Sequence, residues 1–212
     1  TENPNASKPR YIWIDAAANF PDFANSKENI ARDLALAKDA GFTDIVVDVR
    51  PTTGDVLFKT NLVDQVKFMY AWIGSNYTKV ERTATWDYLQ AFVDEARKQG
   101  LRIHAAINTF VGGNQIDGGT GLLYRDQSKA EWATQMNMQV GITSVMNTSE
   151  STKFFNPAHP EVQTFLCDLL KDLAGYDLDG IFLDRGRFLN LQADFSEESR
   201  KQFEEYMGGI RI

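Results

Sequence analysis

The chain repeats one local pattern: a helix-ending glycine, a short apolar strand, and a polar or charged residue where the strand ends. The pattern occurs at residues 40–50, 99–108 and 175–184, and the strand at 11–15 ends in the same way. Strands that alternate with amphipathic helices predict an α/β fold with a parallel sheet. The apolar run at 181–183 is expected to be a short strand buried on both faces, as parallel strands usually are.

The polar ends of these strands are the candidate site. Carboxyl ends of parallel strands meet at one edge of the sheet, and ligands of α/β folds bind there. Asp184 is the first candidate for catalysis, and Arg185 and Arg187 are expected to keep it ionised because nearby positive charge stabilises a carboxylate. The other candidates at strand ends are Asp15, Asp48, Arg50 and Asn108.

Two of these positions have a competing structural interpretation. Side chains alternate along a strand, so Asp48 and Arg50 should share the face opposite Ile45, Val47 and Val49. An acid and an arginine two residues apart form a structural ion pair more often than they form catalytic machinery. Both interpretations of the pair, structural and substrate-binding, therefore stay open.

Composition and charge exclude several classes of function. The 212 residues, 43% hydrophobic and 24% charged, predict one globular domain with a substantial core. A net charge of −7 without a basic cluster argues against a nucleic acid partner and favours a neutral or cationic ligand. No apolar run approaches the roughly 18 residues of a membrane span. The two histidines are widely separated, so neither a metal nor another cofactor is expected.

The region 51–83 lacks a helical period but carries five aromatic residues. A connection of this length inside a compact domain is usually functional. The rings, Trp72 among them, either wall a sugar-binding cleft or form a small satellite core; the sequence favours neither. The glycine-rich stretch at 111–121 predicts a turn-rich loop, and 132–147 a hairpin.

Helices are expected to end at Gly41, Gly100 and Gly175, and a last one to run from Ser196 to Met207. Cys167 falls in the apolar register of the third helix and is expected to be a small core residue. Residues 1–10 predict a flexible polar leader, which could be what remains after removal of a secretion signal.

Several stretches together resemble the glycoside-hydrolase-like family ten proteins. They are the segments at 13–20, 47–51, 106–110, 155–160 and 179–185, and the most specific are Asn156-Pro-Ala-His-Pro160 and Asp179-Gly-Ile-Phe-Leu-Asp184. The resemblance implies a bacterial, exported (β/α)8 barrel allied to the α-amylase clan. A full barrel takes about 250 residues and eight strands. Only four or five strands are visible, so residues 11–212 are expected to form the first part of a glycosidase-like barrel.

The resemblance also implies the chemistry. In that clan the acid ending the fourth barrel strand is the nucleophile, which implies Asp184, with a retaining mechanism on a poly- or oligosaccharide. The other candidates are expected to bind the sugar: Asp15, Asp48, Arg50, Asn108, Asn156, Arg185, Arg187 and Trp72. The general acid would lie beyond residue 212, so this chain alone is expected to be inactive. The alternatives are a non-catalytic carbohydrate-binding barrel and an α/β assembly module. An extracytoplasmic location is expected.

Overall fold

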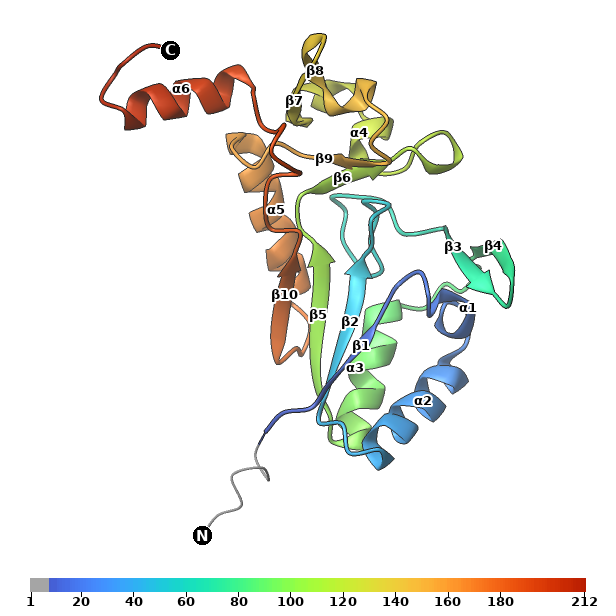
Figure 1. The fold of residues 1–212 in the computed structure, drawn as a ribbon. Helices are drawn as coiled ribbons and strands as arrows, with labels where there is room; N and C mark the ends of the chain where they lie inside the picture. Colours follow the sequence, from blue (N-terminus) through green and yellow to red (C-terminus); the bar gives the residue numbers. More distant parts are fainter. Residues whose placement is uncertain (1–7) are drawn as a thin grey trace.

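The computed structural model describes residues 8–212, so most of the expected leader lies outside the described residues. Four parallel strands form the central sheet in the order in which they occur in the chain (Figure 1). They are β1 (Tyr11–Ile14), β2 (Asp44–Arg50), β5 (Arg102–Asn108) and β10 (Gly180–Asp184). The predicted α/β fold with a parallel sheet is therefore confirmed.

A helix follows each of the first three strands. These are α2 (Lys27–Asp39), α3 (Tyr88–Gln99) and α5 (Pro160–Leu173), and the short α1 (Phe20–Phe23) precedes α2. Each long helix begins at a side chain that accepts a backbone N–H of its first turn, supplied by Ser26, Asp87 and His159. Gly100 caps α3 in the left-handed conformation, as its position predicted.

The helices cover one face of the sheet because strand side chains alternate. Ile45, Val47 and Val49 of β2 join the hydrophobic core, as do Ile103 and Ile107 of β5. The apolar stripes of α2, α3 and α5 pack into the same core. Asp48 and Asn108 consequently point to the other face.

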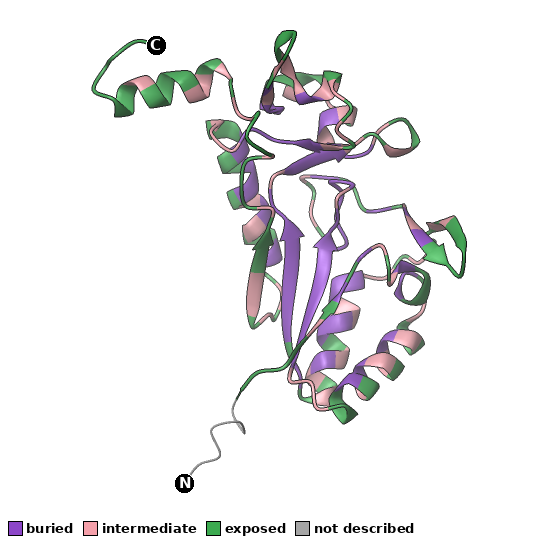
Figure 2. Cartoon of the chain, viewed as in Figure 1, coloured by how far each residue is buried: buried purple, intermediate pink, exposed green. Residues whose placement is uncertain are grey.

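The expectation that the strand at 181–183 is buried on both faces is wrong. β10 pairs only with β5 and forms one edge of the sheet, and its side chains are half-buried or exposed (Figure 2). β1 forms the other edge. Three strand spacings would separate these edges by roughly 14 Å in a flat sheet. The rings of Trp13 on β1 and Phe182 on β10 nevertheless lie 5.6 Å apart, centroid to centroid, so the sheet is strongly curled.

Smaller elements surround the carboxyl end of the sheet (Figure 1). The region 51–83 contains an antiparallel hairpin that the sequence did not predict, and 132–147 contains the hairpin that it did. The last helix, α6, projects away from the sheet (Figure 1). The elements are β3 (Phe68–Ile73), β4 (Asn76–Glu81), β6 (Val111–Asn114), η1 (Ile116–Gly118), α4 (Leu122–Arg125), η2 (Gln127–Trp132), β7 (Gln135–Met138), β8 (Gly141–Ser144), η3 (Val145–Asn147), β9 (Thr152–Phe154) and α6 (Glu197–Tyr206).

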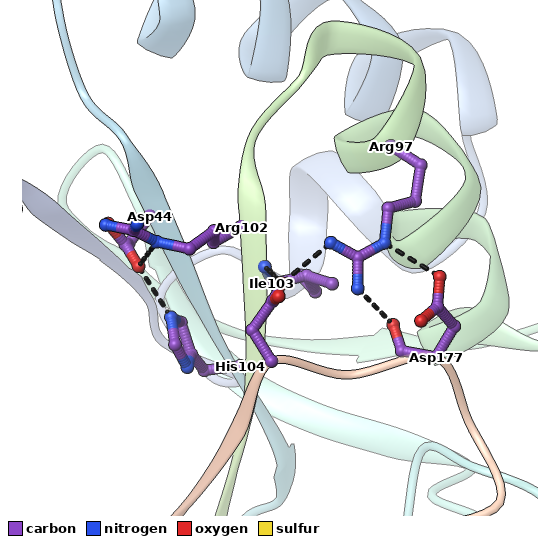
Figure 3. A network of polar contacts seen from close by, with 7 residues as sticks. Asp44, Arg97, Arg102, Ile103, His104 and Asp177 are labelled. Atoms are coloured by element: carbon purple, nitrogen blue, oxygen red, sulfur yellow. Dashed lines mark hydrogen bonds and ion pairs between the residues drawn. The ribbon is translucent and has the colours of Figure 1, made fainter.

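The amino end of the sheet is held by charged side chains (Figure 3). Asp44 accepts two hydrogen bonds of 2.8 Å from the Arg102 guanidinium and one of 2.7 Å from the imidazole of His104. Arg97 of α3 binds Asp177 and Asp179, on the segment before β10, at 2.8 and 2.7 Å. These contacts join β2 to β5, and α3 to the segment before β10.

Two further sequence expectations meet the structure here. Cys167 is exposed, and the expectation of a core position is wrong: the buried stripe of α5 contains Phe165 and Leu166, and the next residue turns outward. Within residues 8–212 no helix is long and apolar enough to cross a membrane.

Candidate functional site

A cavity of about 130 Å³ opens at the carboxyl end of the sheet. All four strands contribute to it, because their polar ends converge where the curled sheet brings β1 and β10 together. We call it the acid pocket. Its lining includes five predicted site residues: Asp15, Asp48, Asn108, Asp184 and Arg185.

Asp15 closes β1 and begins a turn. Its carboxylate accepts the backbone N–H groups of Ala17 and Ala18 at 2.9 and 2.7 Å. These bonds hold one carboxylate oxygen against the turn while the residue stays exposed. Asp15 is thus fixed in place and still accessible to a ligand.

Asp48 is the buried acid of the pocket. Its carboxylate accepts the backbone N–H of Arg50 at 3.2 Å. Burial raises the pKa of Asp48 to about 7. The negative charges of Asp15 and Asp184 add to this effect, and the hydrogen bond from Arg50 opposes it. At neutral pH the carboxyl group is therefore protonated in about half of the molecules, and it can then donate a hydrogen bond as well as accept one.

Asp184 is exposed at the end of β10, and its carboxylate accepts the backbone N–H of Arg185 at 2.7 Å. Arg185 has a left-handed backbone, with φ of 47°, which is uncommon for a residue other than glycine. The backbone carbonyl of Asp184 accepts the N–H of Thr109 at 2.8 Å, which ties the strand end to the neighbouring loop. The acid is thus held by the turn that follows it.

Asn108 lies beside Asp184 in the sheet register and is buried. Its side-chain amide donates to the backbone carbonyl of Arg50 at 2.9 Å, which leaves the amide oxygen for a ligand.

Arg50 itself does not line the acid pocket, contrary to its predicted role. A register shift between Asp48 and Arg50 interrupts the regular alternation. The guanidinium instead donates to the backbone carbonyls of residues 108, 109 and 111, and its predicted ion pair with Asp48 is replaced by these bonds.

Three other predicted site residues also lie outside the acid pocket. Asn156 is buried and donates to the Ser196 hydroxyl at 2.9 Å, so it joins α6 to the body of the domain. Arg187 donates to the backbone carbonyls of the two residues that follow it, in the loop after β10. Trp72 lies on the β3–β4 hairpin and is 68% exposed. Asn156, Arg187 and Trp72 therefore do not contribute to the lining of the acid pocket.

Phe68, Tyr70 and Tyr77, three of the rings that the sequence offered as the wall of a cleft, continue the site; the sequence missed the hairpin that carries them. A second cavity, of about 340 Å³, lies next to the acid pocket and shares Ala17, Thr52 and Met69 with it; we call the two together the groove. The hairpin supplies most of the aromatic lining of this second part. The one sequence signal for the hairpin is Gly74-Ser75, a two-residue turn between the apolar strand β3 and the mostly polar strand β4.

Within residues 8–212 no group of three or more histidine, cysteine, aspartate or glutamate side chains is arranged to hold a metal ion.

The chain is similar to a known protein family and to individual known proteins. A family model described as glycosyl hydrolase-like 10 matches residues 8–208. An S-layer-related protein of Niallia circulans is 30% identical over 210 residues, which cover 96% of this chain and 13% of that protein. The chain therefore spans about an eighth of the length of this relative.

Two solved glycosidases share the fold. An α-L-fucosidase isoenzyme 2 of Paenibacillus thiaminolyticus is 18% identical with a TM-score of 0.58, covering 95% of this chain and 26% of that chain. An α-galactosidase, AgaA, of Geobacillus stearothermophilus is 14% identical with a TM-score of 0.56, covering 95% and 25%. At these identities the likeness concerns the fold. The match of the family model over nearly the whole chain shows that this protein belongs to the glycosyl hydrolase-like 10 family.

Proposed function

We propose that the chain provides the nucleophile and the sugar-binding side of a glycoside hydrolase site. The observation that carries the proposal is the acid pocket, where Asp15, Asp48 and Asp184 meet at the carboxyl end of a curled parallel sheet. Acids gathered where a ligand can reach them suit a polyhydroxylated substrate, because each carboxylate oxygen accepts hydrogen bonds from hydroxyl groups. The family and the fold of the two glycosidases support the same class of substrate.

Asp184 has the role of nucleophile in this proposal. It is the exposed acid on the last strand, and its backbone is fixed by the turn at Arg185. In a retaining mechanism its carboxylate attacks the anomeric carbon, while a second carboxyl group about 5 to 5.5 Å away gives its proton to the leaving oxygen. Water then hydrolyses the covalent intermediate. Asp15, Asp48 and Asn108 hold sugar hydroxyls.

The sheet is proposed to be the first half of a (β/α)8 barrel. Its strands follow one another in chain order with a helix after each of the first three, and its curl brings Trp13 to Phe182. Exposed apolar side chains on both edge strands support further strands on each side: Tyr11 and Trp13 on β1, and Phe182 and Leu183 on β10. The second catalytic carboxyl group would lie on those strands. The location proposed is outside the cytoplasm, which the S-layer-related relative supports.

The decisive experiment is Asp184→Asn in the intact protein, assayed for release of reducing sugar from a panel of polysaccharides. We expect a loss of more than about a thousandfold in turnover with binding retained, because the amide keeps the shape of the acid but cannot attack. Asp168→Asn, an exposed acid on α5, is the matched control. Undiminished turnover by the Asp184 variant would remove this residue from the mechanism.

A second candidate function is carbohydrate binding without cleavage. It is favoured by the state of the other two acids: one oxygen of Asp15 is held by backbone N–H groups, and Asp48 is buried. Binding on a glycan array, with no sugar released by the intact protein, would support this function over the hydrolase.

A further inference from the structure

The β3–β4 hairpin carries an aromatic face that the core does not use. Alternation along β3 places Met69 and Ala71 inward, where both are buried. The opposite face presents the four rings of Phe68, Tyr70, Trp72 and Tyr77. We call this set the aromatic platform.

The rings of the platform lie in contact with one another. Tyr70 and Tyr77 are stacked with 5.3 Å between ring centroids, and Trp72 lies 5.2 Å from Tyr77. Trp72 is 68% and Tyr77 57% exposed, although rings of this size usually gain stability by burial. A contiguous exposed aromatic surface is characteristic of a binding site.

The platform borders the groove that begins at the acid pocket. Phe68, Tyr70 and Tyr77 line the 340 Å³ cavity, and Asn114, Gln115 and Ser151 line its other side. This volume falls within the range of small-molecule sites, whereas the acid pocket, at 130 Å³, can enclose no more than one sugar unit. Ala17, Thr52 and Met69 line both cavities, so the two are close enough for successive units of one ligand to occupy them.

The two walls of the groove are tied together. The Tyr70 hydroxyl donates to the carboxylate of Asp117 at 2.8 Å, and Lys79 pairs with the same carboxylate at 2.6 Å. Asp117 lies in the glycine-rich loop, on η1, with a left-handed backbone. The groove is therefore held at a set width before any ligand binds, and this pre-organisation lowers the entropic cost of binding.

The charges along the groove restrict the ligand. The acid pocket contributes three aspartates against the single arginine Arg185, and in the platform region the charge of Lys79 is balanced by Asp117. An anionic polymer would be repelled from the pocket. Neutral sugar rings fit both parts, since their hydroxyl groups bind carboxylates and their apolar C–H faces stack on aromatic rings.

We propose that the aromatic platform binds further units of a neutral oligo- or polysaccharide whose reacting unit occupies the acid pocket. The inference rests on the proposed function and specifies its substrate: a chain laid along the groove. A lone terminal sugar would leave the platform unused.

The test measures affinity by calorimetry for cello-, xylo-, malto- and chito-oligosaccharides of two, four and six units. We expect the protein to bind six units of one series more tightly than two. Tyr77→Ala and Trp72→Ala should each weaken binding of the hexamer about tenfold and binding of the dimer less than about twofold, because one stacking contact is lost. Tyr77→Phe, which keeps the ring, should restore the hexamer affinity.

Tyr206→Ala on α6 is the control, since it removes an exposed ring that belongs neither to the aromatic platform nor to the lining of the groove. Circular dichroism checks that every variant is folded. Equal affinity for two and six units, or unchanged hexamer binding by both alanine variants, would overturn the inference and leave the proposed role of the acid pocket standing. If the protein binds none of the four series, the proposed function fails together with the inference.

Discussion

The two ends of the parallel sheet differ in how their buried acids are surrounded, and the pKa values of those acids are shifted in opposite directions. At the amino end Asp44 is fully buried, yet Arg102 and His104 satisfy its carboxylate. The hydrogen bond from Arg102 holds the pKa of Asp44 well below its usual range. Burial opposes this effect, and hydrogen bonds from Thr43 and His104 add to it. At the carboxyl end burial, reinforced by the charges of Asp15 and Asp184, raises the pKa of Asp48.

The difference separates stability from function within one sheet. Paired charges at the amino end favour the folded state. Crowded acids at the carboxyl end oppose it, and proteins commonly accept such a cost where a ligand requires the arrangement. Substitutions at the two ends should therefore change stability in opposite directions.

The largest expected effect is at the crowded end. The folded pKa of Asp48, about 7, exceeds its unfolded value of 3.8, so the unfolded chain loses this proton first as pH rises. Wild-type stability should fall between pH 4 and pH 7, by at most about 4 kcal/mol. Asp48→Asn removes this loss and should raise the free energy of unfolding at pH 8 more than at pH 4, as measured by urea denaturation. An equal change at both pH values would contradict a raised pKa of Asp48 in the folded protein.

The next effect has the opposite sign. Asp44→Asn leaves Arg102 and His104 without their charged partner, and we expect a loss of about 3 kcal/mol in the free energy of unfolding at pH 7. Because the folded pKa of Asp44 is lowered, its contribution is present above pH 4 and disappears as pH falls further. The difference between the variant and wild type should therefore shrink in acid. A loss below about 0.5 kcal/mol at pH 7 would show that this end does not depend on charge pairing.

The smallest effect concerns the partly exposed pairs of Arg97. Arg97→Ala removes the contacts to Asp177 and Asp179, and we expect a loss of about 1 kcal/mol because solvent screens these charges. Lys171→Ala, which breaks the exposed pair with Asp168, is the control and should cost less than about 0.5 kcal/mol. If both variants cost the same, the Arg97 network contributes no more than an ordinary surface pair.

Local signals in the sequence predicted the main sheet and the positions of most of its acids. Glycine stops and apolar runs marked β2, β5 and β10, and the shared direction of the strands placed Asp15, Asp48 and Asp184 at one edge. Those signals are local: each marks where one strand or helix begins or ends.

The errors came from long-range features. The exposure of β10 depends on which strand pairs with its outer side, and the apolar run at 181–183 carries no information on that. The displacement of Arg50 depends on a register shift against β5. The hairpin at 68–81 was missed because both of its faces contain apolar residues, which hides the alternation.

The tie between Tyr70, Lys79 and Asp117 has an evolutionary consequence. It joins the hairpin and the glycine-rich loop through their own side chains, independently of the contacts that hold the sheet. Trp72 and Tyr77, which take no part in it, could therefore change in evolution, and with them the preferred polymer, while the scaffold and the aspartates stay the same.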